Sequence, residues 1–253
     1  MLFEDRSRAE SFGASAERYD RARPSYPPEL IEALLADGAQ KVLDVGCGTG
    51  IASTMFAARG CAVLAVEVDE RMAELARVKG LEVEVARFEQ WSPGARRFDL
   101  VASAQAWHWI DPRAGAARAA EALRRGGLLG LFWNFGQPHP SVREPLARIY
   151  ARLEPGIERY SVLLGNRDTR TQATLAGIAE SAELGPPATA SFHWKKSYET
   201  ARWLEHLSTH SDHQALAAPN REQLLAAVSD AIDAIGGSFE MSYEAVLVSA
   251  RRL

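Results

Sequence analysis

The segment Lys41-Val-Leu-Asp-Val-Gly-Cys-Gly-Thr-Gly50 is the most informative part of the sequence, because an apolar strand in it runs directly into a glycine-rich turn. Glycine has no Cβ and tolerates positive φ, so such a turn lets the backbone approach a ligand closely. We therefore expect a nucleotide-like ligand at the end of this strand. The pattern is typical of a cofactor-dependent enzyme.

The spacing of the glycines and the charges around the turn limit which class of ligand it can bind. A dinucleotide motif of the form Gly-x-Gly-x-x-Gly needs its third glycine at position 51, where this chain has Ile51. Asp44, two residues before Gly46, would repel a pyrophosphate and attract an ammonium group. Glu67 ends the next apolar run, 21 residues after Gly46, and its carboxylate can accept ribose hydroxyls. The alternative is an NAD-dependent oxidoreductase, and both Ile51 and Asp44 argue against it.

These motifs resemble the class I S-adenosylmethionine (SAM)-dependent methyltransferases. The resemblance implies SAM as cofactor and S-adenosylhomocysteine as product, with the glycine turn and Asp44 at the methionine end and Glu67 on the ribose. Arg87 stands where many relatives have an acid, so we expect backbone contacts from Phe88 to the adenine. The cofactor-binding residues implied are Tyr19, Arg23, Asp44, Gly46, Cys47, Gly48, Gly50, Glu67, Val68, Met72, Phe88, Glu89, Ala104, Gln105 and Ala106.

The segment from Phe98 to Trp109 resembles the fourth strand and its exit in a small-molecule subgroup that includes the trans-aconitate methyltransferase-like enzymes. Residues 12–26 resemble the lead-in of that subgroup, which folds over the cofactor as a lid. The tryptophans are either a stacking wall for the acceptor or packing in the core. The substrate candidates are Tyr26, Trp107, Trp109, Trp133, Asn134, Thr209, Ser211 and His213.

Two histidines are the catalytic candidates. His108 follows the fourth strand, and an imidazole can accept a proton near neutral pH, but it could equally anchor the loop or the methionine carboxylate. His210 lies with His206 and His213 on one face of a helix if that segment is helical. The spacing is similar to a zinc site, with Asp212 as a possible oxygen ligand, yet no cysteine is nearby. We expect a polar pocket wall there and no metal.

Composition excludes several classes of protein. The chain has 253 residues, a net charge of -4 and a pI near 5.9, and no Lys/Arg stripe interleaved with aromatics, so nucleic acid is not expected as a partner. Two cysteines give no disulfide framework and favour a reducing compartment. No apolar run approaches the roughly 18 residues of a membrane span. We expect a cytoplasmic protein, monomer or homodimer, without membrane contact.

The alternation of strand-like and helical runs predicts an α/β fold, with a doubly wound, mainly parallel seven-stranded sheet, an antiparallel last strand and a helical cap. Gly126-Gly127 is interpreted as a helix stop before the fifth strand. Strands are expected at 41–46, 62–67, 82–86, 99–104, 128–133, 191–198 and 239–249. Within one domain, 1–253, we expect a lid at 1–27, a SAM-binding core at 28–136, a cap at 137–187 and closing elements at 188–253.

The predicted reaction is methyl transfer from SAM to a small molecule, preferably to an oxygen such as the hydroxyl of a sugar or secondary metabolite, with a histidine as base. A carboxylate acceptor, as in trans-aconitate methylation, needs no base and would favour cations such as Arg143, Arg167 or Arg170. A non-catalytic SAM-binding module is the third possibility. The sequence leaves these alternatives open.

Overall fold

The computed structural model describes residues 12–158 and 167–253. In these residues seven strands form one sheet in the order β3-β2-β1-β4-β5-β7-β6. The strands are β1 (Lys41–Val45), β2 (Ala62–Glu67), β3 (Glu82–Val85), β4 (Phe98–Ala104), β5 (Leu123–Pro138), β6 (Ala188–Glu199) and β7 (Ser238–Arg251). The pairs from β3 to β5 are parallel, and β7 runs antiparallel to both of its neighbours. The expected α/β fold is confirmed.

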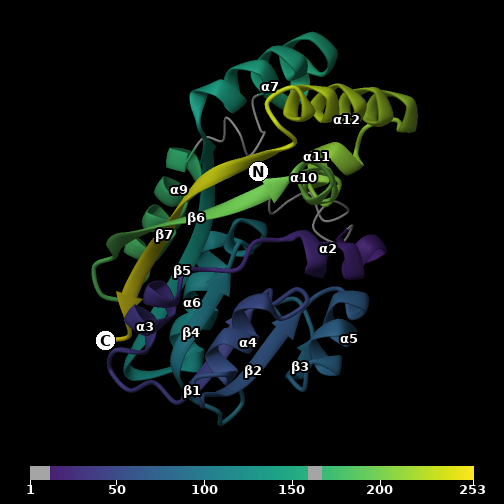
Figure 1. Cartoon of the computed structure of the whole chain (residues 1–253). Helices are drawn as coiled ribbons and strands as arrows, with labels where there is room; N and C mark the ends of the chain where they lie inside the picture. Colours follow the sequence, from purple (N-terminus) through teal and green to yellow (C-terminus); the bar gives the residue numbers. More distant parts are fainter. Residues whose placement is uncertain (1–11, 159–166) are drawn as a thin grey trace.

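Helices cover both faces of the parallel strands (Figure 1). The first helices are η2 (Phe12–Ser15), α2 (Ala16–Ala22), α3 (Pro28–Leu35), α4 (Ile51–Ala57), α5 (Glu70–Val78), η3 (Trp107–Trp109) and α6 (Pro112–Ala122). Those that follow are α7 (Pro140–Leu153), α8 (Pro155–Glu158), α9 (Arg167–Ala179), α10 (Thr200–Leu207), α11 (Ser211–Gln214) and α12 (Ala218–Asp233). Helices α3 and α4 pack on one face and α6 on the other. Within the described ranges, no helix is both long enough and apolar enough to cross a bilayer.

The expected cap segment contributes to two different places. Helix α7 packs on α12 through a cluster that includes Leu146, Tyr150 and Val228, and Figure 1 shows these two helices beyond the ends of the long strands. Helix α9 instead returns to the sheet, where Ile178 is buried in the same core cluster as Ala116 of α6. The segment that follows β5 therefore builds a second lobe and also completes one face of the core.

The interpretation of Gly126-Gly127 as a helix stop is wrong. Helix α6 ends at Ala122, and both glycines lie within β5. The pairing of β5 with β4 is irregular here, since Phe98 pairs with Leu123 but Leu100 pairs with Leu128. Gly126 has φ +74°, and a Cβ on Gly127 would lie 2.9 Å from a backbone oxygen. The two glycines serve an irregular strand start, which the short motif did not distinguish from a helix end.

Candidate active site

The glycine turn lies between the ends of β1 and β2. Gly46 has φ +67°, and its N–H donates to the Val66 carbonyl at 2.8 Å. A Cβ on Gly46 would lie 2.4 Å from the Cβ of Ala106, which follows β4. The position therefore requires glycine both for its conformation and for the close approach of a neighbouring segment. Gly48 and Gly50 also have positive φ, and Gly50 is the N-cap of α4.

Glu67 joins the end of β2 to this turn. Its Oε2 accepts the Gly48 N–H at 2.8 Å, and its Oε1 accepts the N–H groups of Val68 and Asp69 at 2.9 and 3.0 Å. A carboxylate offers about four acceptor positions, so three backbone contacts leave roughly one for a ligand. One ribose hydroxyl can bind directly, whereas a second would share a position with a backbone N–H. Glu67 is thus placed at the turn where the sequence predicts it.

Asp44 lies beneath the turn, shut off from solvent. Its Oδ2 accepts the Ser53 hydroxyl at 2.5 Å, while its Oδ1 has no hydrogen-bond partner. Burial raises its pKa to about 6, and burial also raises the pKa of Glu67. The two carboxylates repel each other, and among the described residues no Lys or Arg forms a salt bridge with either of them. The pair therefore leaves negative charge without a salt bridge at the strand ends. Because Asp44 is fully buried in this conformation, it would attract a cationic ligand electrostatically and not by direct contact.

Gln105 occupies a strained backbone position at the exit of β4, directly after Ala104. It has φ +60°, unusual for a residue with a side chain. Its N–H donates to the Phe132 carbonyl at 2.9 Å, and its Nε2 donates to the Asn134 carbonyl at 3.2 Å. Such strain persists where surrounding contacts enforce it, and it is frequent at functional sites. The structure brings Ala106 beside the glycine turn, whereas Gln105, which precedes it, contacts β5.

The other cofactor candidates take supporting positions. Met72 is buried below the turn, with its Cε 3.4 Å from where a Gly48 Cβ would lie. Phe88 packs its ring on Trp91 at 6.0 Å, so its side chain belongs to the core. Glu89 accepts the Asp111 N–H at 3.2 Å. Cys47 is buried within the turn, and burial raises the pKa of its thiol.

The lid residues Tyr19 and Arg23 lie next to each other at the end of α2. The Arg23 guanidinium stacks on the Tyr19 ring at 4.8 Å from its centroid and donates to the Thr209 carbonyl at 2.9 Å. The Nε of Arg23 is buried without a hydrogen-bond partner. The end of α2 therefore contacts the segment between α10 and α11, and it carries a cation whose hydrogen bonding is incomplete.

His108 accepts a hydrogen bond at the nitrogen that decides its tautomer. The indole N–H of Trp133 donates to its Nδ1 at 3.3 Å. A neutral imidazole that accepts at Nδ1 carries its proton on Nε2, so Nε2 is a donor. The ring also lies 4.9 Å from that of Trp109. In this arrangement His108 is suited to donate a hydrogen bond to an oxygen, rather than to remove a proton through Nε2.

The histidines of α10 and α11 are engaged with each other and with buried partners. His206 and His210 approach through their Nε2 atoms at 3.2 Å. His213 approaches the Tyr150 hydroxyl at 2.7 Å through Nε2 and the Asp212 carboxylate at 2.8 Å through Nδ1. In the part of the chain that the structure describes, no group of three or more such side chains is arranged to hold a metal ion. The cluster ties α11 to α7.

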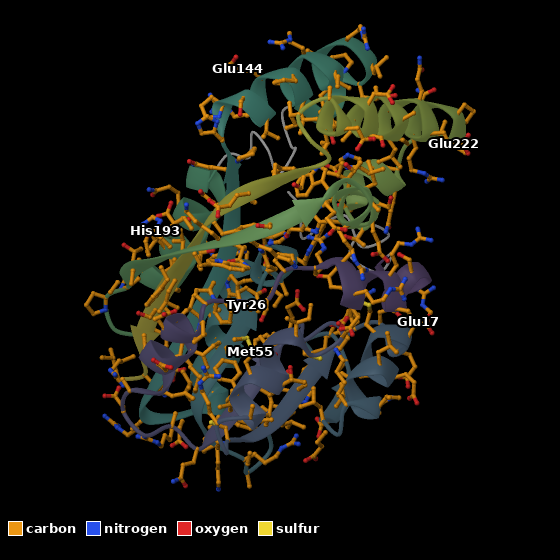
Figure 2. All side chains as sticks on the ribbon, viewed as in Figure 1. Glu17, Tyr26, Met55, Glu144, His193 and Glu222 are labelled. Atoms are coloured by element: carbon orange, nitrogen blue, oxygen red, sulfur yellow. The ribbon has the colours of Figure 1, made fainter. Side chains whose placement is uncertain are left out.

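Several substrate candidates are buried. Trp107, Trp133 and Tyr26 pack in the core, and the Tyr26 ring meets the Phe132 ring edge-on at 4.8 Å. Figure 2 shows Tyr26 near the middle of the molecule. These aromatic side chains fit the packing interpretation better than a stacking wall. Trp109 is half-buried.

The polar substrate candidates hold backbone segments together. Asn134 donates through Nδ2 to the Ser25 carbonyl at 2.9 Å and accepts from the Trp194 indole at 3.1 Å. Thr209 is buried, with its hydroxyl donating to the His206 carbonyl at 2.7 Å. Ser211 is half-buried at the start of α11. The side chains of Arg167 and Arg170 lie outside the described part of the structure.

Sequence reasoning missed three residues around the glycine turn. Thr49, inside the turn, donates its hydroxyl to Asp20 of α2 at 2.6 Å, and Lys79 donates to the Thr49 carbonyl at 2.8 Å. No periodicity or short motif pairs residues this far apart in the chain. The charge of Asp20 beside Tyr19 in the lid was the one available signal.

Known proteins with sequences similar to this chain are methyltransferases. A family model described as a methyltransferase domain matches residues 42–127. An uncharacterised methyltransferase of Mycobacterium tuberculosis is 43% identical over 127 residues, 49% of this chain and 52% of the relative. A trans-aconitate 2-methyltransferase of the same species is 29% identical over 170 residues, 65% of this chain and 60% of the relative. The chain thus spans little more than half the length of these curated relatives.

Solved structures share the fold. A candidate type II methyltransferase from Anaeromyxobacter dehalogenans aligns with a TM-score of 0.67 at 22% identity, covering 90% of this chain and 97% of the other. Phosphoethanolamine N-methyltransferase 2 from Haemonchus contortus, solved with S-adenosyl-L-methionine, aligns with a TM-score of 0.52 at 16% identity, covering 100% and 60%.

The fold is that of these solved methyltransferase structures, and residues 42–127 are similar to the methyltransferase domain that the family model describes.

Proposed function

We propose that the protein is a SAM-dependent methyltransferase that acts on a small molecule. One observation carries the proposal: Asp44 and Glu67, two buried carboxylates with raised pKa values, lie at neighbouring strand ends without a salt-bridge partner among the described residues. A ligand that combines a ribose with positive charge would offset both. A pyrophosphate at the same place would add repulsion, which opposes a dinucleotide.

The glycine turn is a second feature that fits SAM. The turn at Gly46 is closed so tightly against Ala106 that no Cβ fits, so this part of the site is backbone without a side chain. When bound, SAM supplies a methyl group already activated for displacement. This chain then has to bind and orient: Glu67 holds the ribose, the glycine turn lies against the methionine part, and the segment from Ala104 to Ala106 lies beside that turn.

We propose an oxygen as the methyl acceptor, and the structure favours a carboxylate over a hydroxyl. A hydroxyl needs a base, and the Trp133 contact leaves His108 with a proton on Nε2. A carboxylate needs no base but benefits from donors and a nearby cation. Arg23, whose Nε is buried without a hydrogen-bond partner, can supply the cation. The trans-aconitate 2-methyltransferase relative agrees with this choice.

Transfer of a labelled methyl group from SAM tests the proposal. Purified protein would be incubated with separate pools of polycarboxylates and of hydroxylated metabolites, followed by mild base. A methyl ester releases its label as volatile methanol, whereas a methyl ether retains it. Volatile label from the carboxylate pool supports the proposal, and stable label from the hydroxyl pool would replace the carboxylate by a hydroxyl. SAM binding without transfer in any pool would favour a non-catalytic module.

The proposal includes a cytoplasmic location and a monomeric or homodimeric state. Both cysteines are free thiols in the structure, which agrees with a reducing compartment.

A further inference from the structure

Asp20 of the lid makes a three-way contact with the glycine turn. Its Oδ1 accepts the Thr49 hydroxyl at 2.6 Å and also accepts from the ammonium group of Lys79. The same ammonium group donates to the Thr49 carbonyl at 2.8 Å. Thr49 is fully buried, and both its side chain and its carbonyl depend on these partners. One lid carboxylate thus completes the hydrogen bonding of a residue inside the turn.

The lid is also held from its other side. Arg21 forms a salt bridge with Glu205 of α10 at 2.9 Å, and Arg23 donates to the carbonyl of Thr209. Helix α2 therefore lies between the glycine turn and α10, and Figure 1 shows it in that position. Of these contacts, the one through Asp20 reaches the turn itself. Displacement of the lid must break it.

We propose that Asp20 is a positioning residue that couples closure of the lid to the shape of the glycine turn. This inference rests on the proposed function, because the ligand held by the turn is SAM or its product. With the lid closed, Asp20 fixes Thr49 and keeps the turn in its binding shape. With the lid lifted, the Thr49 hydroxyl loses its acceptor, and the turn loosens as the ligand is exposed.

The physical reason lies in the composition of the turn. Thr49 stands between Gly48 and Gly50, and both glycines have positive φ. Glycine has more accessible backbone conformations than any other residue, so a turn of this kind is held by the contacts of its other members. Glu67 fixes the Gly48 N–H from one side, and Asp20 with Lys79 fixes Thr49 from the other.

The experiment compares Asp20→Ala with Glu17→Ala. Both residues are acidic members of α2, and Glu17 is exposed at the edge of the molecule (Figure 2). The first readout is hydrogen exchange of residues 12–23 and 46–50 in the protein without ligand. The second is the dissociation rate of S-adenosylhomocysteine, measured by competition with excess ligand. Thermal unfolding of each variant checks that the fold is retained.

Asp20→Ala should accelerate exchange in both segments and raise the dissociation rate about tenfold, as expected from the loss of a partly buried charge-assisted contact. Glu17→Ala should change neither. Lys79→Met should have a similar effect, and the double variant should add little, because Asp20, Lys79 and Thr49 form one connected hydrogen-bond network.

Two results would overturn the coupling: faster exchange in the lid alone with an unchanged turn, or equal behaviour of Asp20→Ala and Glu17→Ala. The hydrogen-exchange readout needs no ligand. A failure of wild-type protein to bind S-adenosylhomocysteine would therefore refute the proposed function separately.

Discussion

The Oε2 of Glu67 accepts the backbone N–H of Gly48 at 2.8 Å, and this contact joins the end of β2 to the glycine turn that follows β1. The acid expected to bind a ribose therefore also shapes the turn expected to bind the methionine part. Both halves of the site depend on one side chain.

Glu67→Gln should weaken binding of S-adenosylhomocysteine by more than about tenfold. Glutamine has one acceptor oxygen, and its NH₂ group would face backbone N–H donors that the carboxylate now satisfies, which costs roughly 1–3 kcal/mol. Titration calorimetry measures the change. Glu222→Gln, an exposed position on α12 (Figure 2), is the control and should bind normally. Equal affinities in the two variants would remove Glu67 from the ligand site.

Gly46→Ala should destabilise the fold more than Gly38→Ala. Both glycines have positive φ, +67° and +72°, so both substitutions introduce a comparable backbone strain. A Cβ at position 38 has open space, whereas one at position 46 would strike Ala106 at 2.4 Å. We expect an excess loss of about 1–3 kcal/mol for Gly46→Ala in denaturant unfolding. No excess would mean that the turn can move away from Ala106.

Ligand affinity should rise with pH through the pKa of Asp44, which burial raises to about 6. Below that pH the carboxyl group is neutral and no longer attracts the ligand's ammonium group, so S-adenosylhomocysteine should bind more weakly at pH 5 than at pH 7. Asp44→Asn removes the titrating group and should flatten this part of the profile. An unchanged slope in Asp44→Asn would assign the pH dependence to another residue.

The same pKa has the opposite consequence for stability. Because burial raises the folded-state pKa of Asp44 to about 6, above its ordinary value of 3.8, ionisation is less favourable in the folded protein than in the unfolded chain. Ionisation of Asp44 does not affect the free energy of unfolding below about pH 4. It lowers this free energy by about 3 kcal/mol once the pH passes 6. Asp44→Asn should therefore unfold at higher denaturant concentration than wild type at pH 7, although it binds ligand more weakly. Parallel losses of stability and binding would contradict this assignment.

Nitrogen-15 NMR should find the neutral ring of His108 protonated on Nε2, because Trp133 donates to Nδ1. Trp133→Phe removes that donor and should shift the ring toward a mixture of tautomers. Assignment of the signal by His108→Gln serves as the control. A ring protonated on Nδ1 in the wild type would restore His108 as a base and favour a hydroxyl acceptor.

Local patterns predicted the parallel half of the fold well. The apolar runs that end in Asp44-Val45 and in Glu67 correspond to β1 and β2, because a buried parallel strand reads as a short, nearly continuous apolar run. Gly126-Gly127 was misread, since a glycine pair marks a helix end and a strand irregularity equally well. The return of α9 to the sheet depends on tertiary packing that its own sequence does not encode in a period.

The candidate site divides in the same way. Residues within the motif, such as Gly46 and Glu67, lie at the turn as predicted. The Trp133 contact to His108 and the Asp20 contact to Thr49 join residues 25 and 29 positions apart on different elements. No spacing rule pairs such residues. The first contact nevertheless determines the tautomer of His108, and the second fixes Thr49 within the glycine turn. The structure was needed to find them.

The most direct test of the central claim is titration calorimetry of the purified protein with S-adenosylhomocysteine and, separately, with NAD. We expect saturable binding of one S-adenosylhomocysteine per chain, weakened by both Asp44→Asn and Glu67→Gln, and no binding of NAD. Binding of NAD in place of S-adenosylhomocysteine, or of neither ligand, would refute the proposed function.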